Sequence, residues 1–378
     1  MKTKSLFATL VTATFLSGGA AFAGPEVVSG PGALPECFAP WDEDTSFLQW
    51  SAKEGPYKIA VVNGFVGNTW RIQMVKTAKA FAEDPTIKDK ISEFKVVSTG
   101  TDAPAQLGAI EDFINQGYDA IITIAVAPTG FDRVIRLADK NDVVLVPFDN
   151  VLDTDKVMQV NEDQLAMGKK WGEFILGELH EMGIDSGKLL EVRGLAGNSV
   201  DRDRSLAINE AIAADGGDWE VVSVVGNWDD GTTQKVVADA IAVHGQFDAV
   251  IGQGGSNGIV QALQDSGHPW VPVAGESENG FRKAIAEHSA DGLKGISIGQ
   301  SPGLVAVAMK AAVSALEGNV MPQLISVPLP VATYKGLEDG KNYWSELPDN
   351  FFTVNEFPPC DVNISGPAIM AESEEDMK

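Results

Sequence analysis

Between residues 57 and 334, short apolar runs alternate with segments in which apolar positions recur every three or four residues. The run at 58–62 suits a buried strand, and after a polar turn at 63–69 the apolar positions step by three, a helical period, at Ile72, Val75, Ala78 and Phe81. Further strands are expected at 94–98, 120–125, 143–148, 188–193, 219–225, 249–252, 271–274, 295–299 and 328–333. Helices are expected at 70–81, 106–116, 131–141, 164–182, 202–214, 232–244, 258–266 and 304–316.

Strands separated by helices predict right-handed βαβ units and parallel sheets. Because the alternation runs once to residue 150 and begins again at 164, the expected fold class is α/β, with two doubly wound parallel-sheet lobes. Later segments return to both cycles, so the chain should cross between the lobes more than once and form a hinge, with crossings expected near Asn161, Gln300 and Val327. The expected division is an N-terminal lobe at 57–160 and 301–327, a C-terminal lobe at 161–300 and 328–345, an irregular N-terminal extension at 24–56 wrapping the outside, and a C-terminal extension at 346–378.

Residues 1–23 have the features of a bacterial secretory signal peptide. They contain two lysines, an apolar run at 6–16 and the sequence Ala-Phe-Ala at 21–23, which predicts cleavage before Gly24. No later run reaches the ~18 apolar residues that a membrane span requires. The mature protein is therefore expected to be exported to the periplasm.

The charge of the chain limits its partners. There are 53 acidic residues and 28 basic residues, for a net charge of −25. A chain this acidic is a poor partner for the phosphates of nucleic acid, because binding to them depends on clustered lysine and arginine. We expect a monomer that binds no nucleic acid.

The two cysteines of the chain, Cys37 and Cys360, stand near its two ends. Two cysteines in an exported chain usually pair, although two buried thiols remain the alternative. A pair would leave no cysteine for a metal site, and the four histidines are scattered without ligand spacing, at His180, His244, His268 and His288. There is no Gly-x-Ser-x-Gly elbow, P-loop lysine or Rossmann spacing. We therefore expect no catalytic residue, metal or cofactor.

Polar and aromatic residues follow the ends of the expected strands. The first loop ends in Asn68, Trp70 and Arg71, where a ligand would meet an apolar face beside a charged fork. Ligands of open α/β sheets bind outside the carboxyl ends of the strands, where these loops must lie. Local packing of Trp70 and a solvated Arg71 are an equally good interpretation of the loop taken alone.

The first strand, loop and helix resemble those of type I periplasmic solute-binding proteins of sugar ABC transporters, in the ribose/galactose-binding branch. That family has an Asn-Pro-aromatic-aromatic loop here. Asn68 matches the asparagine and Trp70 the first aromatic, while Thr69 replaces the proline and Arg71 the second aromatic. The resemblance covers about residues 57–334 and implies the two-lobed fold with a three-crossing hinge.

Four later segments carry the resemblance further. Asp149 matches an aspartate that bonds sugar hydroxyls, with Asn150 in place of the arginine that follows it in the family. Arg204 matches the arginine that the family delivers to the sugar, and Trp228 stands where it places a stacking aromatic. Gln300, in a Gln-x-Pro sequence, matches a glutamine that touches the sugar at a hinge crossing.

Two loops depart from the family. Gln253 is followed by two glycines where the family has Asn-Asp, and Gly275 is followed by Glu276 and Ser277 where it has aromatic-Asp. Either Glu276 or Ser277 is expected to replace that aspartate. These departures remove residues that would single out ribose or glucose.

The resemblance implies a periplasmic protein that captures a small carbohydrate, a monosaccharide or polyol, and delivers it to an ABC importer permease. Two arginines against Asp149 and Glu276 favour a neutral ligand, whereas a Glu276 that points away would favour a sugar acid. Alternatives are a periplasmic sugar-processing enzyme and a ligand-presenting chemosensor. A sugar-responsive repressor would need a helix-turn-helix in place of the signal peptide. The expected ligand-binding residues are Asn68, Trp70, Arg71, Asp149, Asn150, Arg204, Trp228, Gln253, Glu276, Ser277 and Gln300.

Overall fold

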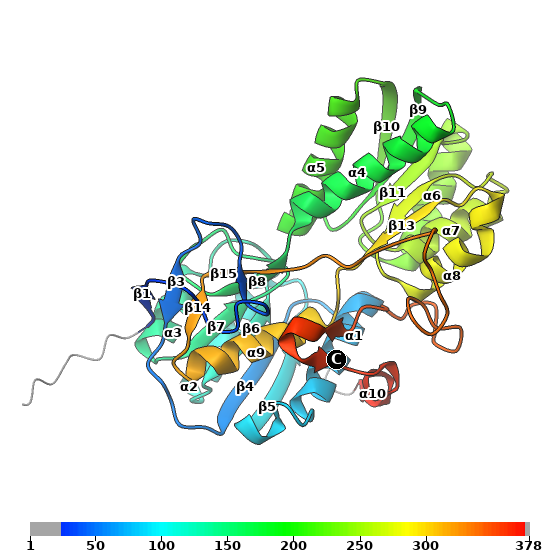
Figure 1. The fold of residues 1–378 in the computed structure, drawn as a ribbon. Helices are drawn as coiled ribbons and strands as arrows, with labels where there is room; N and C mark the ends of the chain where they lie inside the picture. The colour runs from blue at the N-terminus through cyan, green and yellow to red at the C-terminus, as the bar shows by residue number, and fades with distance from the viewer. Residues whose placement is uncertain (1–23, 375–378) are drawn as a thin grey trace, which may run out of the picture.

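The computed structural model describes residues 24–374, so the expected signal peptide at 1–23 lies outside the described residues. Two groups of strands, each covered by helices on both faces, form two lobes joined by several chain crossings (Figure 1). We call them the N-terminal and C-terminal lobes. Within the described part of the chain, none of the helices combines the length and apolar character needed to cross a membrane.

The N-terminal lobe is built on a four-stranded parallel sheet, in the order β5 (Ile91–Ser98), β4 (Tyr57–Asn63), β6 (Ala120–Ile124) and β7 (Val144–Pro147). Successive side chains of a strand point to opposite faces. In β4, Ile59 and Val61 therefore enter the core formed with α1 (Thr69–Ala82) and α9 (Leu304–Leu316). Ala60 and Val62 enter the core with α2 (Ala103–Asn115) and α3 (Asp132–Lys140). The middle of β4, from Ile59 to Val62, is apolar because both of its faces are covered.

The C-terminal lobe has a six-stranded sheet, in the order β10 (Asp218–Val225), β9 (Ser186–Arg193), β11 (Ala249–Gly252), β12 (Val273–Gly275), β13 (Gly295–Ile298) and β16 (Val331–Thr333). The strands are parallel except β16, which is antiparallel to β13. One face is covered by α4 (Gln164–Glu181) and α5 (Ser199–Asp215). The other is covered by α6 (Asp230–His244), α7 (Ser256–Asp265) and α8 (Asn279–His288). Sequence periodicity did not predict α8, a ten-residue helix with two large apolar residues, Phe281 and Ile285.

Short strands accompany the crossings between lobes. β8 (Gln159–Glu162) runs parallel to β15 (Leu324–Val327), with Glu162 opposite Val327, and β2 (Ala39–Pro40) completes this small sheet. A third connection, at 299–303, leads from β13 to α9. The strand expected at 328–333 is shorter than predicted, because only Val331–Thr333 form β16, at the edge of the C-terminal sheet, while β15 ends at Val327 in another sheet. Pro328 and Pro330, between β15 and β16, have no backbone N–H to donate to a neighbouring strand.

The N-terminal extension is not the irregular outer wrap that the sequence suggested. It contains β1 (Glu26–Val28), β2 and β3 (Phe47–Gln49), and β3 lies between β1 and β14 (Val320–Pro322) in an antiparallel sheet. Phe38 and Trp50 are buried in the core of the N-terminal lobe. The strands are two or three residues long, too short for an alternating pattern to stand out among prolines and glycines.

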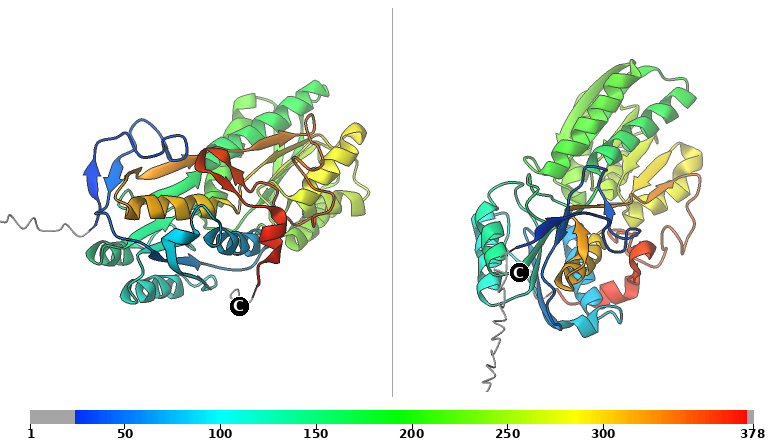
Figure 2. Two further views of the ribbon diagram at one scale, coloured as in Figure 1. Left: turned by 60° about the horizontal axis from the view of Figure 1, so that its bottom comes forward. Right: turned by 60° about the vertical axis from the view of Figure 1, so that its left-hand side comes forward.

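The C-terminal extension also packs against the N-terminal lobe, beside α9 (Figure 2). It comprises β17 (Glu356–Phe357), the 3₁₀ turn η3 (Pro358–Cys360), β18 (Val362–Asn363) and α10 (Gly366–Ala371). Phe357 and Ile369 join the same core as α1 and α9. Cys37 and Cys360 form a disulfide with a Cα–Cα separation of 4.6 Å, which confirms the expected pair. Two further 3₁₀ turns are η1 (Lys88–Lys90) and η2 (Ser289–Asp291).

Candidate functional site

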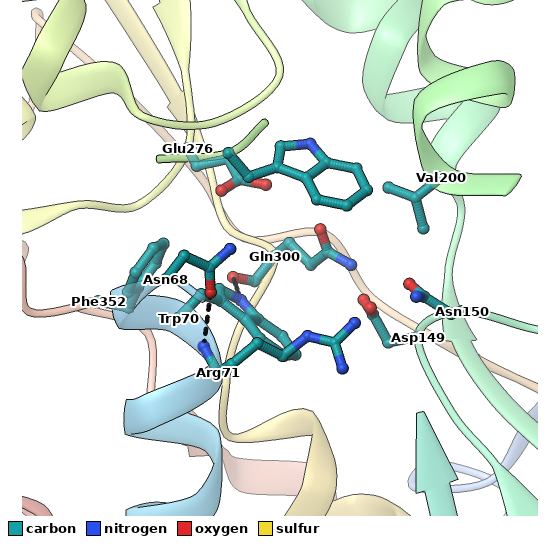
Figure 3. Close-up of a pocket in the computed structure, with 10 residues that line it drawn as sticks. Asn68, Trp70, Arg71, Asp149, Asn150, Val200, Glu276, Gln300 and Phe352 are labelled. Atoms are coloured by element: carbon teal, nitrogen blue, oxygen red, sulfur yellow. Dashed lines mark hydrogen bonds between the residues drawn. The ribbon is translucent and has the colours of Figure 1, made fainter. Parts of the chain in front are cut away.

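A cavity lies between the two lobes at the ends of their strands (Figure 3). The centres of water-sized spheres can occupy about 30 Å³ of it, which is room for two or three waters. A sugar-sized molecule therefore enters only if the lobes or the lining side chains separate. The cavity is lined by Asn68, Trp70, Arg71, Asp149, Asn150, Val200, Trp228, Glu276, Gln300 and Phe352.

The start of α1 supplies three of these residues. Asn68 is the N-cap, and its side-chain oxygen accepts a bond from the Arg71 backbone N–H at 2.9 Å. This use as a cap leaves the amide group of Asn68 for the cavity. The Trp70 indole N–H donates to the Gln300 carbonyl at 3.1 Å, which joins the first helix to a chain crossing.

Arg71 keeps most of its hydrogen-bonding capacity. It is 5% exposed, and its Nη1 donates to Asn63 Oδ1 at 2.8 Å. Its other guanidinium donors have no partner among the described residues. Burial lowers the pKa of Arg71 to about 10, an effect that nearby Asp149 opposes. A guanidinium with this pKa stays charged at neutral pH and can donate to a ligand.

Asp149 faces Arg71 without forming an ion pair within 4 Å in the described structure (Figure 3). Its backbone has φ of +61°, a left-handed conformation that is uncommon outside glycine. Burial raises the pKa of Asp149 to about 7, although Arg71 and Arg204 act to lower it. Its Oδ1 is buried and lacks a hydrogen-bond partner among the described residues. The neighbouring Asn150 is held by a bond from its amide to the Ala125 carbonyl at 2.8 Å.

Trp228 forms part of the wall from the C-terminal lobe. Its ring lies against Gly194 and Gly254, where an added Cβ would come within 2.0 and 2.8 Å of ring atoms. Asn227 and Trp228 both have positive φ, 55° and 57°, which is unusual for a bulky residue. Such strain persists where surrounding structure enforces it, often at functional sites. The two glycines thus explain how a large aromatic ring fits beside the cavity.

Arg204 lies behind the cavity wall and is fully buried. Its Nε donates to Gln164 Oε1 at 2.8 Å, and its Nη1 donates to the Gln253 carbonyl at 2.6 Å and to Glu276 Oε1 at 2.7 Å. Its Nη2 donates to Gln300 Oε1. Four of its five donors are therefore taken by protein groups. Burial raises the pKa of Glu276, while the Arg204 ion pair opposes that shift.

Glu162 is a buried acid at the hinge that sequence reasoning did not single out. It is 0% exposed, and neither carboxylate oxygen makes a hydrogen bond of ordinary geometry within the described residues. Burial raises its pKa well above the usual range, with Asp149 adding to the effect and Arg204 opposing it. The backbone N–H of Ser301 opposes the shift only weakly, so the buried acid is held more favourably in the protonated form.

The structure brings most of the sequence-predicted residues to one cavity. Eight of the eleven line it, whereas Arg204, Gln253 and Ser277 lie behind its wall. Gln253 Nε2 donates to the Asp201 carbonyl at 3.2 Å, and the Ser277 carbonyl accepts from the Thr353 N–H at 2.9 Å. Val200 and Phe352 line the cavity but were not predicted. Phe352 follows another phenylalanine in the C-terminal extension, but several other apolar residues of that extension do not reach the cavity, so the sequence held no distinctive signal for it.

The cavity offers the chemistry that a sugar requires. Hydroxyl groups both donate and accept, and they suit the free guanidinium of Arg71 and the unpartnered oxygen of Asp149. Trp70, Trp228 and Phe352 supply apolar faces for C–H groups. Within residues 24–374, no cluster of three or more histidine, cysteine or acidic side chains is arranged to hold a metal ion.

Comparisons with known proteins give the family. The family model described as a periplasmic binding protein domain matches residues 59–319. A xylitol-binding protein of Mycolicibacterium smegmatis is 25% identical over 182 residues, 47% of this chain and 51% of that one. The galactofuranose-binding protein of Escherichia coli is 29% identical over 147 residues, 38% of this chain and 44% of that one. The chain thus spans about half the length of these two relatives.

Solved structures share the fold. An ABC transporter solute-binding protein from Thermobispora bispora has a TM-score of 0.69 and 23% identity, covering 80% of this chain and 92% of that one. A galactofuranose-binding protein has a TM-score of 0.64 and 20% identity, covering 73% and 95%. These likenesses confirm the α/β fold with parallel sheets in two lobes. Because the family model covers well over half of its 378 residues, the chain belongs to the family of type I periplasmic binding proteins.

Proposed function

We propose that this protein captures a neutral monosaccharide or polyol between its lobes in the periplasm and delivers it to an ABC importer. The observation that carries the proposal is the set of free polar groups facing one enclosed cavity between two aromatic walls. Arg71 donors and Asp149 Oδ1 come from one lobe, and Trp228 and Glu276 come from the other. The names of the relatives, which bind xylitol and galactofuranose, support the same ligand class.

The charge balance of the site favours a neutral ligand over a sugar acid. Glu276 points toward Arg204 and forms an ion pair at 2.7 Å, so it compensates that arginine. Arg71 faces Asp149, which offsets its charge when ionised. A carboxylate ligand would add a negative charge beside Asp149 and Glu276, whose own ionisation is already disfavoured by burial.

Closure of the lobes on the ligand would let a permease distinguish the loaded protein from the empty protein. A ligand that contacts both lobes binds the closed form better than the open form, and that difference shifts the equilibrium toward closure. The small volume of the cavity requires such an opening for entry. We therefore expect a smaller radius of gyration in small-angle scattering when ligand is added to the open, unliganded protein.

A thermal-shift screen over pentoses, hexoses, polyols and sugar acids tests the proposal. A ligand at 100 times its Kd should add about 2.7 kcal/mol to the free energy of unfolding. We expect neutral compounds to stabilise the protein, sugar acids to fail, and calorimetry to give one site per chain without chemical change of the ligand. Turnover of the sugar, or stabilisation by sugar acids alone, would contradict the proposal.

A further inference from the structure

A second, larger cavity lies between the C-terminal lobe and the C-terminal extension. Water-sized spheres can occupy about 650 Å³ of it, against about 30 Å³ in the cleft. One wall comes from β16 and α8 of the C-terminal lobe, and another from the loop at 340–347. The remaining wall is formed by residues 351, 353–356 and 363–367, the part of the extension that packs on the N-terminal lobe.

The segment 351–355 separates this cavity from the cleft. Phe352 lines the cleft, whereas the residues on either side of it, Phe351 and Thr353, line the larger cavity. Backbone bonds fix the segment to the C-terminal lobe, from Thr353 N–H to the Ser277 carbonyl at 2.9 Å and from Asn279 N–H to the Phe351 carbonyl at 2.7 Å. The cavity is therefore distinct from the sugar site and has a firm wall.

Arg282 of α8 is the buried charged group of this cavity. It is 4% exposed, and within residues 24–374 no carboxylate lies within ion-pair distance of it. Its Nε donates to Ser297 Oγ and its Nη1 to the Asn342 carbonyl, both at 2.8 Å. An arginine has five N–H donors, so these bonds leave three, one on Nη1 and two on Nη2. Burial without a compensating acid lowers the pKa of Arg282 to about 10.

An uncompensated buried cation is costly to a folded protein. Arg282 is nevertheless held in place, because the helix that carries it, α8, is also hydrogen-bonded to the loop at 340–347 through Asn279. The Asn279 side chain donates to the Trp344 carbonyl at 2.8 Å and accepts from the Trp344 N–H at 2.9 Å. The two free-edge nitrogens of a guanidinium match the two oxygens of a carboxylate.

The apolar lining limits the rest of the ligand. Trp344, Phe351, Leu347 and Ile364 contribute aromatic and aliphatic surface around the charged group. The acids that line the cavity, Glu346 and Glu356, are exposed residues at its rim. A ligand would thus have a carboxylate at one end for Arg282 and an apolar body for the remainder of the cavity.

We propose that this cavity is a second ligand site, which binds a small organic carboxylate with an apolar or aromatic body through Arg282. Its walls come from both lobes, so an occupant would touch the moving parts on the side away from the cleft. The site is independent of the sugar proposal, since it shares no lining residue with the cleft.

The test uses 4-fluorobenzoate as the probe, followed by fluorine NMR during titration with the full mature chain. We expect saturable broadening and a shift of the fluorine signal with 4-fluorobenzoate. The neutral analogue 4-fluorobenzyl alcohol should bind at least tenfold more weakly. The variant Arg282→Gln should weaken 4-fluorobenzoate binding at least tenfold. The control Arg133→Gln removes an equal charge from an arginine whose side chain is 78% exposed, and should bind like the wild type.

A second variant keeps the test decisive if Arg282→Gln does not fold. Asn363 is an exposed residue of the cavity lining, and Asn363→Asp adds a negative charge there without touching Arg282. It should weaken the probe several-fold. Equal binding of the acid and the alcohol, unchanged binding in both cavity variants, or the absence of saturation would each overturn the proposal.

Discussion

The two walls of the cleft use arginine in opposite ways. On the C-terminal wall, Arg204 is fully buried and donates to four protein acceptors, including Glu276 at 2.7 Å. On the N-terminal wall, Arg71 is nearly as buried but donates to Asn63 alone among the described residues. N–H donors that bond to protein acceptors stabilise the wall, whereas N–H donors without a protein acceptor are available to a ligand. The comparison assigns structure to Arg204 and recognition to Arg71.

The largest expected effect, on the free energy of unfolding, comes from replacing Arg204, whose donors bond to the protein. Arg204→Met leaves Glu276 buried without its partner, and breaking a buried pair this way costs about 3–5 kcal/mol. Urea unfolding measures the loss. The double variant Arg204→Met with Glu276→Leu removes both charges and should recover most of the stability. A loss below about 1 kcal/mol in the single variant would show that the network does not hold the wall.

The matching change on the other wall should affect binding and leave folding largely intact. Arg71→Gln should remove charge-assisted hydrogen bonding to the ligand, for which one bond contributes about 1.5–3 kcal/mol. The Kd for the sugar found by the screen should rise by about 100-fold, with unfolding free energy changed by about 1 kcal/mol or less. Calorimetry on this variant, beside the exposed control Arg202→Gln, decides the matter. Equal affinity in wild type and Arg71→Gln would remove Arg71 from recognition.

Glu162 extends the comparison to a buried acid. Its carboxylate oxygens make no hydrogen bond of ordinary geometry within the described residues, and they do not line the cleft cavity. Glu162→Met should stabilise the protein by about 1–3 kcal/mol at pH 8, since an unsatisfied buried group is removed. Glu278 is the matched control: it is also buried, but accepts from the Gly255 and Asn257 N–H groups at 3.0 and 2.7 Å. Glu278→Met should therefore destabilise.

The pH dependence of the Glu162 effect has a definite sign. Burial raises the folded pKa of Glu162 above its unfolded value, so the folded form retains a proton that the unfolded form loses. The resulting destabilisation grows as pH rises from the unfolded pKa toward the folded one and is absent below both. Chemical unfolding at pH 4 and pH 8 measures it. A stability difference between wild type and Glu162→Gln that does not change with pH would contradict this account.

Asp149 gives the smallest expected signal, a change in bound protons. Its pKa of about 7 leaves it roughly half protonated at pH 7. Ligand hydroxyls that donate to the carboxylate lower that pKa, so binding should release roughly half a proton at pH 7 and almost none at pH 9. Calorimetry in buffers of different ionisation enthalpy measures this release. Asp149→Asn should abolish it, and proton uptake on binding would reverse the assigned role.

Much of the fold followed from local sequence patterns. The strand β4 and the helix α1 were expected because apolar periodicity is read within a dozen residues. The same reasoning missed α8, which is short and begins with polar residues, and the three strands of the N-terminal extension. Those strands are fixed by partners near residue 320, far along the chain, and by the disulfide to Cys360.

The prediction of the site from the sequence was limited in the same way, because contacts between distant residues could not be foreseen. Strand-end loops and the family resemblance placed Trp70, Arg71 and Asp149 together, and all three line the cavity. The different states of the two arginines could not be foreseen, because the partners of Arg204 lie up to 96 residues away in the sequence. Phe352 and Glu162 were missed because an aromatic in an extension and an acid at a strand end have no distinctive local pattern. Only tertiary packing shows which groups remain unpaired.

A crystal structure of the complex with the sugar found by the screen would show which of the two arginines contacts the ligand. The account predicts one sugar between the lobes, with hydroxyls bonded to the Arg71 guanidinium and to Asp149, rings of Trp70 or Trp228 against its C–H face, and Arg204 still bonded to Glu276. A sugar bonded directly to Arg204 with the Glu276 pair broken, or a sugar bound outside the cleft, would contradict it.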